Sequence, residues 1–158
     1  MGDDYDGIRS EIEGYIAQMK KEQISSLIID VRNNEGGEDD AGVIIAEQFA
    51  KEDMFYLKET TYDVDSGEYI ENRTLRMDAK ASIDIPIHLM VNSNCISAGE
   101  GFVYNMAKLP QATVVGIQGT NGSFGTVEGV STMPEGMIVA YIVDRFMPKF
   151  RILISGGR

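Results

Sequence analysis

Three short apolar runs, rich in branched side chains, restrict the fold of this chain more than any other feature. They read SLIIDV at 26–31, IPIHLMV at 85–91 and ATVVGI at 112–117. Continuous apolar runs of this length are typical of strands that are buried on both faces of a parallel sheet. Successive parallel strands need a long crossover connection, which is usually a helix. The chain should therefore place amphipathic helices between these runs.

Helical patterns occur where such a fold needs them. In residues 4–22, apolar side chains recur every three or four positions and form one face. Residues 41–51 and 97–109 also have the pattern of helices, the first with Asp39 or Asp40 as its N-cap. Strands that alternate with helices in this way predict an α/β fold, with a mainly parallel sheet and right-handed crossovers.

An inserted segment interrupts this alternation. The runs MFYLKETTYD and EYIENRTLRM flank turn residues Asp65, Ser66 and Gly67, a pattern that predicts a β-hairpin. We expect the hairpin to form a substrate wall or a subunit contact, and its deletion to spare folding. A Gly-rich loop is predicted at 118–129, followed by strand-like sequence in GMIVAYIVDRF and FRILIS. Because no repeat or linker is visible, we expect a single domain over residues 1–158.

Composition narrows the possible partners. The net charge is −11, which argues against nucleic acid or an anionic membrane surface, because both attract clustered Lys and Arg. No apolar run approaches the roughly 18 to 20 residues that span a bilayer.

A single His and a single Cys exclude an ordinary zinc cluster and an internal disulfide. The acidic run EGGEDD also lacks the spacing of an EF-hand, so we expect neither a metal nor another cofactor.

Two strand-to-helix turns carry the residues that are best suited to catalysis or ligand binding. EGGEDD follows the strand at 26–31, and NSNCISAGE follows the strand at 85–91. Ligands of open α/β sheets bind at the carboxyl ends of the strands. If these two strands are neighbours, Gly36 and Gly37 lie beside Ser97, although about 60 residues separate them in the chain.

This pairing has two interpretations. A serine at a helix N-terminus gains from the helix dipole, and a Gly-Gly turn lets backbone N–H groups approach a substrate closely. Together they resemble a nucleophile with an oxyanion hole, as acyl transfer requires. Alternatively, Ser97 is an N-cap and Glu100, three residues later, completes a capping box, while the glycines only form a loop. Spacing alone leaves both interpretations open.

The order of three segments adds a resemblance. LIIDVRNNEGG, IPIHLMVNSNCISAGEGF and ATVVGIQGTNGSFG resemble the carboxy-terminal processing and tricorn core family of serine peptidases, over about residues 5 to 155. The resemblance implies a crotonase-like fold and hydrolysis of peptide bonds. It implies that Ser97 is the nucleophile and that the oxyanion donors are the backbone N–H groups of Ala98 and of Gly36 or Gly37.

The general base is the part of the family pattern that this sequence lacks. In the processing branch a Lys follows the third strand, whereas this chain has Ser123, which could orient substrate or a water molecule. His88 lies in a strand about nine residues before Ser97, beyond the hydrogen-bond reach of roughly 3 Å. The tricorn branch takes its His from a segment before the first helix, so we expect the base outside this chain.

Two residues near these turns are expected to have structural roles. Cys95 stands where the family often has Thr and should be a small buried residue. Arg32 should anchor its loop by pairing with Asp30 or Asp39.

The expected partner is a peptide or protein substrate, with a homo-oligomer possible and an exported or cell-envelope location if the resemblance holds. The alternative is a catalytically inactive domain that binds peptides or serves as an assembly module.

Overall fold

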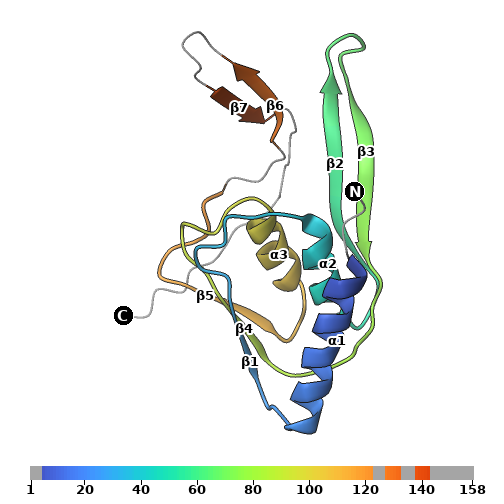
Figure 1. The fold of residues 1–158 in the computed structure, drawn as a ribbon, viewed down its shortest axis with the longest axis vertical. Helices are drawn as coiled ribbons and strands as arrows, with labels where there is room; N and C mark the ends of the chain where they lie inside the picture. The colour runs from blue at the N-terminus through green and yellow to red at the C-terminus, as the bar shows by residue number, and fades with distance from the viewer. Residues whose placement is uncertain (1–4, 123–126, 133–137, 143–158) are drawn as a thin grey trace.

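The computed structural model describes residues 5–122, 127–132 and 138–142. In chain order its elements are α1 (Tyr5–Lys21), β1 (Leu27–Asp30), α2 (Asp39–Glu47), β2 (Met54–Asp63), β3 (Glu68–Met77), β4 (Ile87–Met90), α3 (Ala98–Met106), β5 (Ala112–Val115), β6 (Val127–Thr132) and β7 (Ile138–Ile142). The predicted alternation of helices and strands is confirmed, including the hairpin that β2 and β3 form between the core units (Figure 1).

β1, β4 and β5 form a parallel sheet in which β4 is central. The register aligns Leu27 with Ile87 at the start of β1 and β4, and Asp30 with Met90 at their ends. Both strands therefore end at the same edge of the sheet, and the loops that follow them become neighbours. The prediction of a mainly parallel sheet with an inserted hairpin is confirmed.

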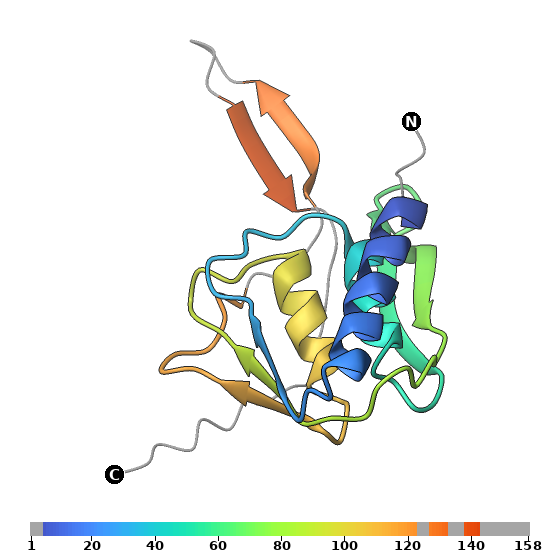
Figure 2. The same ribbon diagram turned by 60° about the horizontal axis from the view of Figure 1, so that its bottom comes forward.

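The sheet has one covered face and one open face. Ile87 and Leu89 are fully buried and point toward the helices, and α1, α2 and α3 all lie on this side in Figure 2. The opposite face leaves Ile28 64% and Val115 48% exposed. The prediction that the strands are buried on both faces is therefore wrong for the described part of the chain.

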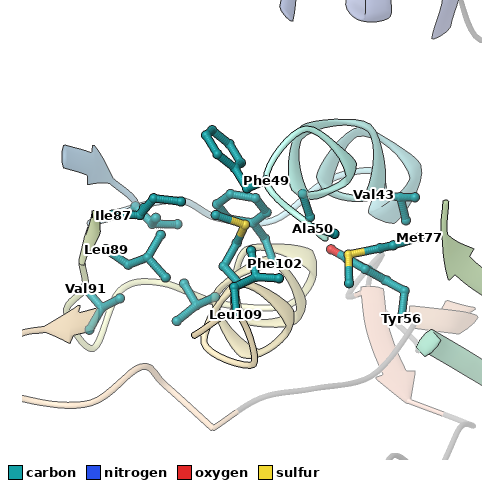
Figure 3. Packing of buried hydrophobic residues seen from close by; sticks show 14 of the residues in the cluster. Val43, Phe49, Ala50, Tyr56, Met77, Ile87, Leu89, Val91, Phe102 and Leu109 are labelled. Carbon is teal, nitrogen blue, oxygen red and sulfur yellow. The ribbon is translucent and has the colours of Figure 1, made fainter. Parts of the chain in front are cut away.

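Buried apolar side chains join the sheet, α2, α3 and the base of the hairpin into one cluster (Figure 3). The hairpin contributes Tyr56 and Met77, which are 1% and 0% exposed. The expectation that deletion spares folding therefore applies only to the outer part of the hairpin, because its base belongs to the core. Only the outer part of the ribbon stands away from the body of the molecule (Figure 1).

An arginine fastens the hairpin to α2. Arg73 on β3 contacts Glu59 on β2 and Asp40 on α2, each at 2.7 Å. Asp40 lies in the first turn of α2, where the helix dipole stabilises a carboxylate. The ion pairs thus hold the hairpin against the end of α2 that follows the Gly36–Gly37 loop.

Two local predictions need correction. The N-cap of α2 is Glu38, whose side chain makes no capping hydrogen bond, so Asp39 and Asp40 are not caps. The predicted Gly-rich loop ends earlier than expected, because β6 begins at Val127 and pairs antiparallel with β7. β7 confirms the strand predicted in GMIVAYIVDRF, whereas FRILIS lies outside the described residues. Among the described helices, none is long and apolar enough to cross a bilayer.

Candidate active site

The loops after β1 and β4 touch each other at the carboxyl end of the sheet. A Cβ atom added to Gly36 would lie 2.8 Å from the Cβ of Ser97 and 3.2 Å from the backbone nitrogen of Ala98. Gly36 also has a φ of +94°, which side chains with L chirality rarely adopt. Only glycine meets both demands here. The structure therefore brings Gly36, Ser97 and Ala98 together, as the sequence predicted.

Ser97 does not have the geometry of an ordinary helix cap. Its φ of 52° and ψ of −128° differ from the extended conformation of N-cap residues, and its side chain makes no capping hydrogen bond. The capping-box interpretation of this serine is therefore wrong. A non-glycine residue in such a region costs about 1–3 kcal/mol and is found mainly where function requires it. A partly exposed serine on a sharp strand-to-helix turn is the arrangement of a nucleophile that a substrate can reach.

Two backbone donors are available near this serine. The N–H of Gly36 donates to Oδ1 of Asn34 at 2.9 Å and is therefore engaged. The N–H groups of Gly37 and Ala98, by contrast, have no acceptor within residues 5–122, 127–132 and 138–142. The Ala98 donor is also the first of helix α3, where the positive end of the dipole favours an anion. The Ala98 N–H in particular lies where a helix terminus favours a negative oxygen, such as that of a tetrahedral intermediate.

Asparagine side chains tie the two loops together. Oδ1 of Asn33 accepts hydrogen bonds from Nδ2 of Asn92 at 2.9 Å and of Asn94 at 3.1 Å. In return, the backbone N–H of Asn33 donates to Oδ1 of Asn92 at 3.1 Å. The backbone oxygen of Asn34 accepts from the N–H of Ile96 at 3.0 Å. These bonds hold the loop after β1 against the loop that carries Ser97.

Arg32 stabilises the first loop from outside. Its guanidinium makes a two-point contact with Asp30, at 2.8 Å and 2.6 Å. The hydrogen bonds from Arg32 lower the pKa of the Asp30 carboxyl to about 2. The predicted pairing of Arg32 is confirmed, with Asp30 rather than Asp39 as the partner.

A buried carboxylate fastens a third loop to the site. Glu100 is 1% exposed, and its Oε1 accepts a hydrogen bond from the N–H of Gly122 at 2.6 Å. In the same loop, Asn121 donates its backbone N–H to the oxygen of Cys95 and its Nδ2 to the oxygen of Ser93, both at 3.1 Å. The loop after β5 therefore lies against the turn that holds the serine. Sequence reasoning missed this role, because it assigned Glu100 to a capping box.

The other polar candidates are not placed to activate Ser97. Cys95 is fully buried, and burial together with the Glu100 carboxylate raises the pKa of its thiol to about 11. His88 lies within β4, in register with Ile28 and Thr113, and is a strand residue as predicted. Within the described parts of the chain, the hydroxyl of Ser97 makes no hydrogen bond to a base. Ser123 lies outside the described residues.

Neither Lys108 nor a metal cluster offers activating chemistry to Ser97 in the described part of the chain. Lys108 lies past the C-terminal end of α3, with its Nζ 2.6 Å from Oδ1 of Asn105. Burial lowers the pKa of this lysine, but it stands at the opposite end of the helix from Ser97. Over the residues that the structure describes, no group of three or more His, Cys, Asp or Glu side chains could hold a metal ion.

Comparison with known proteins places this chain in a family. The sequence model of Peptidase family S41 matches residues 4–152. The chain belongs to peptidase family S41. It is 28% identical over 137 residues to the "Probable CtpA-like serine protease" of Staphylococcus haemolyticus, an alignment that covers 86% of this chain and 26% of the relative. This S41 chain therefore spans about a quarter of the length of that curated relative.

Solved structures agree with the family assignment. The crystal structure of a candidate peptidase from Parabacteroides merdae matches with a TM-score of 0.68 and 26% identity, covering 86% of this chain and 43% of that chain. The photosystem II D1 C-terminal processing protease matches with a TM-score of 0.61 and 22% identity, covering 88% of this chain and 34% of that chain. The second likeness shows the fold. The predicted resemblance to processing peptidases is confirmed at the level of the family.

Proposed function

We propose that residues 1–158 form one serine-peptidase core domain, which hydrolyses peptide bonds through Ser97. The observation that carries this proposal is the approach of the bare Gly36 backbone to Ser97, where an added Cβ would lie 2.8 Å from the serine Cβ. Beside it, the N–H groups of Gly37 and Ala98 supply the oxyanion hole. Gly37 takes this role rather than Gly36, since the N–H of Gly36 already donates to Asn34.

The proposed reaction follows from this geometry. Oγ of Ser97 attacks the substrate carbonyl carbon and passes its proton to a general base. The carbonyl oxygen becomes an oxyanion that receives hydrogen bonds from Gly37 and Ala98, each worth roughly 2.7–4 kcal/mol in related chemistry. The amine leaves with a proton, and water then releases the acyl group from the serine. We infer that the base comes from outside the described residues, while the hydroxyl of Ser123 orients substrate or water.

A fluorophosphonate probe tests this proposal directly. We expect mass spectrometry to find the probe on Ser97 in the full-length gene product, because phosphonylation needs an activated serine. Ser97→Ala should abolish the label. Ser93→Ala is the matched control, since this exposed serine of the same loop should leave labelling unchanged. This chain alone should label slowly or not at all if the base lies elsewhere.

The same measurement decides against the alternative. If a correctly folded full-length protein carries no label on Ser97, the peptidase proposal fails. The chain is then an inactive S41 domain that binds peptides or assists assembly. Labelling of the 158-residue chain at the full-length rate would show instead that the base lies within this sequence.

The outer part of the hairpin is the proposed substrate wall or subunit contact. It exposes apolar side chains that a free surface ribbon does not need: Tyr62 45%, Val64 82%, Tyr69 49% and Ile70 51%. An isolated two-stranded ribbon is only marginally stable in water, so a partner surface would stabilise it. The partner is either a peptide or a second copy of the chain.

A variant with a shortened hairpin tests these two roles while the core residues of the hairpin stay in place. Thr60 and Glu71 are cross-strand partners, so residues 61–70 can be replaced by an Asn-Gly turn. We expect the free energy of unfolding to change by less than about 1 kcal/mol, because Tyr56 and Met77 stay in the core. Cleavage preference in a peptide library, or the mass measured by light scattering, should change. If both stay as in the wild type, the outer hairpin has neither role.

A further inference from the structure

The loop that carries Gly36 and Gly37 has unusual backbone freedom. Gly36 and Gly37 have φ values of +94° and +138°, and glycine adopts positive and negative φ almost equally well. Two such residues in succession can rotate the peptide group between them, which carries the Gly37 N–H. An oxyanion donor is useful only if its direction is set before the reaction. Some contact must therefore hold this loop.

Asn34 makes the contact that holds it. Its side-chain Oδ1 accepts a hydrogen bond from the N–H of Gly36 at 2.9 Å, and this closes a tight turn two residues long. Its backbone oxygen accepts from the N–H of Ile96 at 3.0 Å. One residue thus bonds both to the glycine loop and to the residue just before Ser97.

A second glycine makes room for this side chain. A Cβ atom on Gly99, in the first turn of α3, would lie 2.7 Å from Oδ1 and 3.2 Å from Cγ of Asn34. The amide of Asn34 therefore packs directly against the helix that supplies the Ala98 donor. The Asn34 side chain therefore lies between the glycine loop and the first turn of α3.

We propose that Asn34 is a positioning residue of the oxyanion hole. By engaging the N–H of Gly36, its side-chain oxygen fixes the Gly36–Gly37 backbone so that the N–H of Gly37 faces the acyl group on Ser97. This inference rests on the proposed peptidase function. Asn34 does not touch the reacting atoms, and its effect passes through the peptide group that it restrains.

Substitutions at Asn34 test the role through the hydrogen bond itself. In the full-length protein, Asn34→Ala should lower the maximal rate of fluorophosphonate labelling by about 10²-fold, the typical effect of losing one oxyanion donor. The probe concentration for half-maximal rate should stay within about threefold, because the binding surface is intact. Asn34→Asp keeps an acceptor oxygen at the same position and should restore most of the rate.

Glu35→Ala is the matched control. Glu35 is the exposed neighbour of Asn34 in the same loop, and its side chain makes no hydrogen bond within the described residues. Its labelling rate should equal that of the wild type. If Asn34→Ala labels within threefold of wild type, or if Asn34→Ala and Asn34→Asp lose the rate equally, the positioning role is wrong.

Gly99→Ala tests the same role while Asn34 stays in place. Alanine is a better helix former than glycine, so α3 itself should not be weakened. The added methyl group must displace the Asn34 amide, and we expect labelling to fall as in Asn34→Ala. A wild-type rate in this variant would contradict the packing argument.

Amide hydrogen exchange separates this inference from the proposed function, because it needs no activity. The N–H of Gly36 should exchange slowly in the wild type and in Asn34→Asp, and faster by about tenfold or more in Asn34→Ala. Equal exchange in all three proteins overturns the restraint by Asn34. If exchange responds as expected but the wild type never labels, the restraint exists and the peptidase function is what fails.

Discussion

Gly36→Ala is expected to remove the reactivity of Ser97, whereas Gly37→Ala should only weaken it. The added methyl group on Gly36 would lie 2.8 Å from the Cβ of Ser97, closer than real Cβ contacts allow, and 3.2 Å from the nitrogen of Ala98, which is tighter than most such contacts. The serine must move, and a misplacement of about 1 Å can cost 10²-fold in rate. Loss of the oxyanion geometry adds about 10²–10³-fold. We therefore expect labelling of the full-length protein to fall by about 10³-fold or more.

The neighbouring glycine supplies the comparison. A Cβ on Gly37 would meet nothing within 4 Å, although its φ of +138° still disfavours a side chain. Its substitution thus adds backbone strain without a clash, and labelling should fall by about 10-fold to 10²-fold. The midpoint of thermal unfolding, measured for both variants, should show whether a loss of labelling comes from the site or from a loss of folding. If Gly36→Ala labels as fast as Gly37→Ala, the close approach between the two loops is not what the structure describes.

The meeting of Gly36 and Ser97 was accessible from the sequence because it depends on topology. Parallel strands end at one edge of a sheet, so two apolar runs followed by distinctive turns are enough to predict neighbouring loops. The observed register of β1 and β4 confirms this pairing, and predicting it requires only the lengths of the two strands. The resemblance to serine peptidases rests on the same three strand ends, and the family match bears it out.

Other features depend on contacts that a linear pattern does not contain. An apolar run marks a strand, but it does not say whether helices cover one face or both, and Ile28 is 64% exposed. Ser97 followed by Glu100 fits a capping box, yet the φ of 52° at Ser97 and the approach of Gly36 to it exist only in the folded chain, where residues about 60 positions apart meet. The engagement of Gly36 by Asn34 likewise depends on local backbone geometry.

Glu100→Ala is expected to have the second large effect, on both stability and reactivity. The variant removes the acceptor of the 2.6 Å hydrogen bond from Gly122, and this bond joins the loop after β5 to the helix that follows Ser97. Hydrogen bonds to charged groups contribute about 1.5–3 kcal/mol, and the free energy of unfolding should fall by that amount. Once the loop is released, it no longer braces the turn that holds the serine, and a misplacement of about 1 Å should lower labelling by about 10²-fold.

Glu47→Ala is the matched control, because Glu47 is also a buried carboxylate, at 5% exposed. Its Oε2 lies 3.1 Å from Nη1 of Arg9, and its Oε1 accepts from the N–H of Asp78 at 3.3 Å, both away from Ser97. Chemical denaturation should show comparable losses of stability for the two variants, while only Glu100→Ala loses labelling. Glu100→Gln keeps an acceptor for Gly122 and should recover most of the rate. Equal labelling in Glu100→Ala and Glu47→Ala would mean that the carboxylate stabilises the fold without shaping the site, and the loop after β5 would then have no part in the reaction of Ser97.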